Sequence, residues 1–200
     1  MRCRSVPGVV AVTLCLLLSG CTQPAATGTE SGTASRATPT AASATATPSP
    51  TPSPPVLPEA ATRPTMAGAE AFVRYFWDVY NYGYEARETK QLQQIAGPDC
   101  TFCQESTARI DRLWRSNAKV EGGHVALKSV VVAPADFTQQ GSVATAIVDQ
   151  AASRVIEADG SVSDTAAADG GLRVDIAIGW DGDSWLILGG ESFPSGAGRT

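Results

Sequence analysis

The chain has 200 residues, of which 43% are hydrophobic and 18% charged, and its formal net charge is −5 at pH 7. This acidic balance argues against a nucleic-acid-binding protein, which needs a basic surface to neutralise phosphates. The composition is uneven, because every aromatic residue lies between Phe72 and Phe193, whereas nine of the 13 prolines lie between Pro24 and Pro64. A uniform globule is therefore excluded, and we expect a targeting segment, a linker and one folded domain.

Residues 1–20 have the features of a secretory signal. Arg2 and Arg4 give a positively charged start, and Val6–Leu18 is apolar apart from three interruptions. That run is shorter than the roughly 20 apolar residues that a membrane-spanning helix needs. A charged start, a short apolar middle and a small-residue end are typical of a signal peptide.

The end of this segment resembles a bacterial lipobox, in the sequence Leu17-Leu18-Ser19-Gly20-Cys21. The resemblance implies that the mature protein begins at Cys21 and carries a diacylglyceryl group on its sulfur. Two acyl chains suffice for stable anchoring, so we expect a contact with the membrane through this lipid, on the extracytoplasmic face. The alternative is an ordinary signal peptide that happens to be followed by a cysteine.

Residues 21–64 are rich in Thr, Ala, Ser and Pro and contain no aromatic side chain. Such a segment cannot bury enough apolar surface to offset its ordering entropy, so we expect a disordered linker. Its proline-rich part, residues 47–55, favours extended polyproline II. We interpret this part as a stalk, and the alternative is a PxxP ligand for an aromatic groove.

Residues 65–193 are expected to form the folded domain, followed by a flexible tail over 194–200. Apolar residues recur at helical spacing after Thr65, which predicts a first helix to about Tyr82. Two adjacent faces of this helix are apolar: Phe72, Phe76, Val79 and Gly83, and Val73, Trp77, Tyr80 and Tyr84. A short helix over 89–96 and a third from the N-cap Asp99 to about Ala118 are expected next. On the third, Glu105 with Arg109 and Asp111 with Arg115 have favourable i, i+4 spacing.

After Gly122 and Gly123 the period changes from 3.6 to 2, which predicts strands. The expected strands cover residues 124–133, 142–153, 172–180 and 184–191, and residues 159–171 are expected to be a mobile loop. Helices followed by an antiparallel meander indicate an α+β domain, with three helices packed on a curved sheet of about four strands.

That order resembles the nuclear transport factor 2-like cone, and the chain as a whole is similar to a family of actinobacterial lipoproteins with no established activity. The resemblance covers residues 1–193. Its most specific segments are Phe72-Val73-Arg74-Tyr75-Phe76 and Gly97-Pro98-Asp99-Cys100-Thr101-Phe102-Cys103.

Cys100 and Cys103 are the only cysteines of the expected domain, and in an oxidising compartment they should form a disulfide. Their spacing at a helix start also fits a redox pair, because helix N-termini depress thiol pKa values. However, a helical pattern precedes them, where a redox motif would follow a strand. We favour a structural staple, and a zinc site lacks ligands, since His124 is the sole histidine.

No nucleophile, phosphate-loop, paired-carboxylate or metal motif is present, so we assign no catalytic residue, metal or cofactor. Asp78 and Asp175 fall on outward-facing positions of their predicted elements. The side chains expected to line a pocket or partner surface are Tyr75, Tyr80, Tyr84, Trp114 and His124. We expect a non-enzymatic binding or scaffolding module of the cell envelope, acting on a protein or small ligand. The alternative is an isomerase- or dehydratase-like enzyme that uses the cone pocket.

Overall fold

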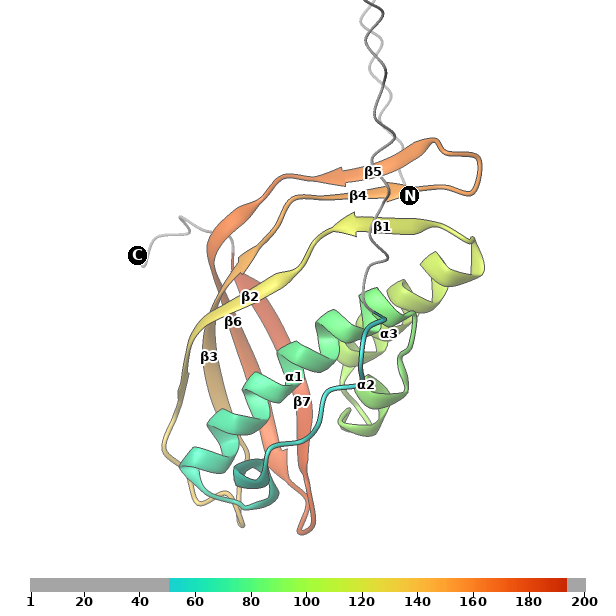
Figure 1. Ribbon diagram of the computed structural model, residues 1–200. Helices are drawn as coiled ribbons and strands as arrows, with labels where there is room; N and C mark the ends of the chain where they lie inside the picture. Colours follow the sequence, from blue (N-terminus) through green and yellow to red (C-terminus); the bar gives the residue numbers. More distant parts are fainter. Residues whose placement is uncertain (1–50, 194–200) are drawn as a thin grey trace, which may run out of the picture. The chain divides into compact units, whose positions relative to one another are not determined.

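The computed structural model describes residues 51–193, and Figure 1 shows the arrangement of their helices and strands. The predicted signal segment, the lipidation site Cys21, most of the linker and the tail 194–200 lie outside the described residues. The predicted α+β class is confirmed. Helices lie against one face of strongly bent antiparallel strands, as expected for a nuclear transport factor 2-like domain.

Helix α1 (Met66–Ala86) begins at Thr65, whose side-chain oxygen accepts a hydrogen bond from the Gly68 amide. It continues four residues beyond the predicted end and stops at Arg87, which adopts a left-handed conformation. Both predicted apolar faces of the helix turn inward. Their members are buried, apart from two tyrosines that are half-buried: Phe72, Val73, Phe76, Trp77, Val79, Gly83, Tyr80 and Tyr84.

Helices α2 (Lys90–Gln94) and α3 (Thr101–Arg115) are shorter than predicted. The predicted N-cap Asp99 is wrong, because Cys100 takes this position and its sulfur accepts a hydrogen bond from the Cys103 amide. The folded region also begins before the predicted boundary at residue 65. A 3-10 helix, η1 (Glu59–Thr62), packs on α1 and buries Ala61.

Within residues 51–193, seven strands form two antiparallel sheets, so the prediction of about four strands in one sheet is wrong. One sheet has the order β2-β3-β6-β7, and the other has the order β1-β4-β5. The strands are β1 (Lys119–Gly122), β2 (Val125–Val132), β3 (Ser142–Gln150), β4 (Ser153–Ile156), β5 (Val162–Ala166), β6 (Asp169–Trp180) and β7 (Trp185–Phe193). The expected mobile loop over 159–171 therefore contains β5 and the start of β6.

The chain passes between the two sheets at three places. β1 leads into β2, β3 leads into β4, and β5 leads into β6, each through two residues. Gly122 and Gly123 make the first of these bends with positive φ angles of 76° and 78°. A Cβ atom on Gly122 would lie 2.0 Å from the Ala152 carbonyl oxygen, so the neighbouring bend occupies the space of a side chain. The smaller sheet thus projects beyond the larger one and alongside α3 (Figure 1).

The core fills the space between α1 and the larger sheet. Phe72 stacks on Trp185 at a centroid distance of 6.1 Å, and Phe76 packs on Trp77 and Phe102. The predicted inward parity of β6 is confirmed, with Val174, Ile176 and Ile178 buried. The interior of the concave sheet is therefore occupied by side chains.

Candidate functional site

A cavity of about 80 Å³ lies where the two sheets bend apart, between the C-terminal half of α1, α3, and strands β1 and β4. Three of the predicted pocket residues, Tyr80, Tyr84 and His124, line it. The helices contribute Glu85 and Arg109 as well, neither of which was predicted to line a pocket. The cavity therefore gathers hydroxyl, carboxylate, guanidinium and imidazole groups at one end of the core.

Asn81 fixes the position of α1 beside this cavity. Its side chain is buried, donates from Nδ2 to the Val125 carbonyl at 2.8 Å, and accepts from the Val125 amide at 2.9 Å. The side-chain amide of Asn81 thus makes the two hydrogen bonds that a neighbouring strand would make to Val125, the first residue of β2. This pair of hydrogen bonds holds the helix face that carries Tyr80 and Tyr84 against the bend.

The two tyrosines extend the aromatic face of α1 toward solvent. Their ring centroids are 5.2 Å apart, and burial is the main cause that raises the pKa of the Tyr80 hydroxyl well above its ordinary value. The interaction with Tyr84 raises this pKa further, whereas the Arg109 guanidinium lowers it. Tyr80 therefore remains a neutral hydrogen-bonding group throughout the physiological pH range, and not a proton acceptor.

His124 lies in the bend between β1 and β2 and reaches back to α1. Its Nδ1 is 3.4 Å from Oε1 of Glu85, and the two side chains are 59% and 53% exposed. Asp78 lies one helical turn before Asn81. Burial raises the pKa of the Asp78 carboxyl, and the electrostatic interaction with His124 lowers it to a smaller extent. Because the side chains of His124 and Glu85 are both more than half exposed, water reaches this pair from the open side of the cavity.

An open groove of about 440 Å³ continues from the cavity between α3 and strands β4 and β5. Arg109, Leu113 and Val155 line both spaces. We call this space the α3 groove, and its lining is completed by Arg112, Ser116, Glu157, Ser163 and Asp164. Arg109 stands at the junction, 3.9 Å from the Asp164 carboxylate across the groove. The predicted pairing of Arg109 with Glu105 is absent from the ion pairs of the described residues.

Two of the predicted pocket residues lie elsewhere. Tyr75 is buried, accepts a hydrogen bond from Gln91, and lines a separate cavity of about 140 Å³ with Phe72 and Trp185. Trp114 is half-buried, and the Arg87 guanidinium covers its ring at 4.3 Å. The predicted partner of Arg115, Asp111, instead accepts a hydrogen bond from Thr89.

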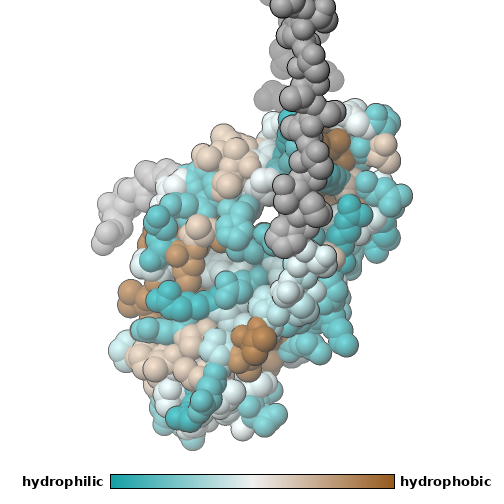
Figure 2. Space-filling model, in the orientation of Figure 1, coloured by the Kyte–Doolittle hydropathy of each residue, from teal (hydrophilic) through white to brown (hydrophobic). Residues whose placement is uncertain are grey.

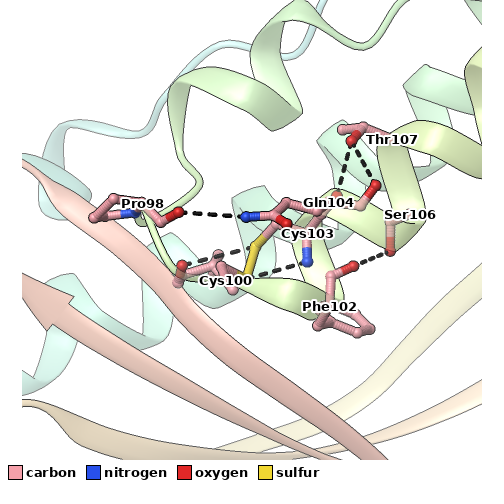
Figure 3. The surroundings of a disulfide bond; sticks show 8 residues. Pro98, Cys100, Phe102, Cys103, Gln104, Ser106 and Thr107 are labelled. Atoms are coloured by element: carbon pink, nitrogen blue, oxygen red, sulfur yellow. Dashed lines mark hydrogen bonds between the residues drawn. A yellow bond between two sulfur atoms is a disulfide. The ribbon is translucent and has the colours of Figure 1, made fainter.

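Cys100 and Cys103 form a disulfide at the start of α3 (Figure 3). Both residues are buried, with exposed fractions of 1% and 7%, which supports the structural interpretation over exchange with a substrate thiol. The preceding turn is tied to the sheet, since the Gly97 amide donates to the Ile187 carbonyl at 2.8 Å. The disulfide therefore secures the end of α3 that packs on β7.

The described residues offer neither a metal centre nor a membrane span. No three His, Cys, Asp or Glu side chains within 51–193 gather closely enough to hold a metal ion. Within the same residues, none of the helices combines the length and apolar character needed to cross a bilayer.

Asn81, Glu85 and Arg109 are the polar helix residues of the cavity that the sequence analysis did not assign to a pocket. Asn81 carried a usable signal, because it is a polar residue between two tyrosines on a helix whose apolar arc is unusually wide. No signal in the sequence indicates that Arg109 lines a cavity, because its spacing from Glu105 is that of an ordinary exposed ion pair.

Several solved structures are similar to this chain at low sequence identity. The intermembrane-space region of the chloroplast protein ARC6 matches with a TM-score of 0.46 and 13% identity, over 66% of this chain and 99% of that one. An uncharacterized protein with a cystatin-like fold from Caulobacter vibrioides has a TM-score of 0.42 and 11% identity, over 62% and 88%. ActVI-ORFA from Streptomyces coelicolor has a TM-score of 0.43 and 11% identity, over 66% and 98%. Scores below 0.5 carry no argument about function.

No curated protein matches the sequence. Residues 39–191 match a protein family described as a family of unknown function, DUF6318. Because this match covers more than half of the chain, the protein belongs to the DUF6318 family.

Proposed function

We propose that the protein is a lipoprotein anchored through Cys21 at the extracytoplasmic face of the cell membrane, and that its folded domain is a non-enzymatic binding module. The anchor rests on the lipobox-like segment and the signal features before it. The 30 residues from Cys21 to Pro50 would reach at most ~93 Å as polyproline II. That length is enough to hold the domain clear of the lipid headgroups.

The filled interior of the concave sheet is the observation that carries the binding role. Small-molecule sites usually enclose about 300 to 1,000 Å³. The cavity at the end of the core has only about 80 Å³, and the larger α3 groove beside it is open to solvent. The titratable pair of the cavity, His124 and Glu85, is more than half exposed. Catalytic groups gain most of their effect in sites that exclude water, so this geometry favours recognition at an open surface.

The anchor is tested by cell fractionation of a Cys21→Ser variant. We expect the wild-type protein in the membrane fraction with a diacylglyceryl mass on its N-terminal peptide, and the variant outside that fraction. Cys15→Ser is the matched control, because Cys15 lies in the predicted signal and should leave the fractionation unchanged. Retention of Cys21→Ser in the membrane fraction would refute the anchor.

The alternative function is an isomerase- or dehydratase-like enzyme, and the contact between His124 and Glu85 beside Tyr84 favours it. The two functions are separated by incubating the protein with extracts of small molecules and following their composition by mass spectrometry. We expect no compound to be consumed. Consumption that a His124→Gln variant abolishes would replace the binding role with the enzymatic one.

A further inference from the structure

The α3 groove and the cavity form one continuous site with a narrow inner part and an open outer part. Arg109, Leu113 and Val155 belong to both parts, so a ligand can extend from the cavity into the groove. The groove alone has about 440 Å³, which falls within the usual range for small-molecule sites, about 300 to 1,000 Å³. The site therefore has room for an elongated ligand that the cavity could not enclose.

The two walls of the groove carry complementary hydrogen-bonding groups. Along α3, Arg109, Arg112 and Ser116 follow the i, i+3, i+7 spacing of one helix face. On the opposite wall, Asp164 of β5 contributes a carboxylate, and Glu157, directly after β4, accepts a hydrogen bond from the Ser163 hydroxyl of β5. Leu113 of α3 and Val155 of β4 add apolar lining to the two walls, and we call this pair the apolar strip.

The charged groups of the walls are only loosely engaged with one another. Arg109 and Asp164 are 3.9 Å apart and 58% and 65% exposed. Exposed pairs of this kind contribute about 0–1 kcal/mol. The Arg112 guanidinium has no ion-pair or hydrogen-bond partner among residues 51–193. A ligand can thus replace the contact between Arg109 and Asp164 at little cost.

The balance of charges decides between ligand classes. Two guanidinium groups face three carboxylates, because Glu85 lines the inner part and Glu157 and Asp164 the outer part. A strongly anionic ligand would meet repulsion from these carboxylates, and a purely apolar one would leave the walls unpaired. An extended peptide that adds as a strand would use the free edge of β1 or β5. The groove is lined instead through Val155 and Asp164, which are register partners on one face of the smaller sheet.

We propose that the α3 groove and the adjoining cavity bind a short neutral oligosaccharide. Sugar hydroxyls both donate and accept, so they can pair with the carboxylates and the guanidinium groups at once. The C–H faces of sugar rings pack on the apolar strip and on the ring of Tyr84 in the inner part. This proposal rests on the proposed function, since a domain tethered outside the membrane is exposed to envelope glycans.

Binding is tested with the full-length protein in detergent micelles, titrated with tri-N-acetylchitotriose, maltotriose and inorganic phosphate by calorimetry and saturation-transfer NMR. We expect at least one trisaccharide to bind and phosphate to leave the site empty. Arg109→Gln and Asp164→Asn should each weaken the binding by about two- to tenfold, the loss expected for one hydrogen bond. Arg115→Gln is the matched control, because Arg115 is on α3 but outside the groove lining.

Absence of binding by both trisaccharides would overturn the proposal, as would binding that Arg109→Gln leaves unchanged. Binding of phosphate alone would also overturn it and point to an anion site. Circular dichroism of each variant verifies folding. These outcomes are independent of the anchor, which the Cys21→Ser fractionation tests separately. Cleavage of a bound trisaccharide would uphold the site while refuting the non-enzymatic role.

Discussion

Replacement of Asn81 by Leu tests how the cavity wall is held together. The substitution removes both hydrogen bonds to Val125, at 2.8 Å and 2.9 Å, and leaves a buried amide and carbonyl without these partners. A net hydrogen bond contributes about 1 kcal/mol, and a buried group left unpaired costs about 1–3 kcal/mol. We therefore expect the free energy of unfolding to fall by about 2–4 kcal/mol.

The change is measured by urea unfolding followed through tryptophan fluorescence, with Arg74→Ala as an exposed control on the same helix. The control should change the unfolding free energy by less than about 0.5 kcal/mol. Hydrogen exchange supplies a local readout, because the Val125 amide should lose its protection in Asn81→Leu. A cost below about 1 kcal/mol with a protected Val125 amide would show that the side chain does not act as a substitute strand.

Three further substitutions examine the bend, the disulfide and an acid-sensitive ion pair. Gly122→Ala should destabilise the fold by at least about 2 kcal/mol in urea, because its Cβ would lie 2.0 Å from a carbonyl oxygen at a positive φ. Joint replacement of Cys100 and Cys103 by Ser should cost about 2 kcal/mol in urea without reductant, and the wild type should not accelerate insulin reduction by dithiothreitol. The hydrogen bond from Arg173 lowers the pKa of Asp175, so this carboxylate stabilises the fold above its unfolded pKa of about 3.9. Asp175→Asn should therefore be destabilising at pH 7, and the difference from wild type should shrink as the pH falls through the lowered folded pKa.

The sequence predicted the first helix and its buried faces because that helix is long and strongly periodic. Phe72 and Phe76 fill the core as expected, and Arg74 and Asp78 face water. The disulfide between the two cysteines within residues 65–193 was also predictable, from their close spacing and the oxidising compartment expected from the sequence. In each case a pattern of neighbouring residues was enough to predict the outcome.

The bends and the smaller sheet could not be read in the same way. Two residues between β3 and β4 are too few to interrupt an alternating pattern, so residues 142–153 read as one strand. All residues of β5 are exposed, which leaves no apolar alternation to detect. The cavity residue Arg109 depends on β5 as well, because Asp164 of that strand is its partner. Because β5 was not predicted, the place of Arg109 in the candidate site could not be predicted either.

The aromatic residues along α1 become more exposed toward the C-terminal end of the helix. Phe72, Phe76, Tyr80 and Tyr84 follow one another at intervals of four residues, the first two buried and the last two half-buried. Tyrosine takes the place of phenylalanine in this series where the sheet bends away from the helix and polar partners become available. A buried hydroxyl without a partner would be costly in free energy. In Figure 2, the visible face of the domain is largely hydrophilic with separate hydrophobic areas. One helix therefore closes the interior with the phenyl rings of Phe72 and Phe76 and lines the cavity with the hydrogen-bonding rings of Tyr80 and Tyr84.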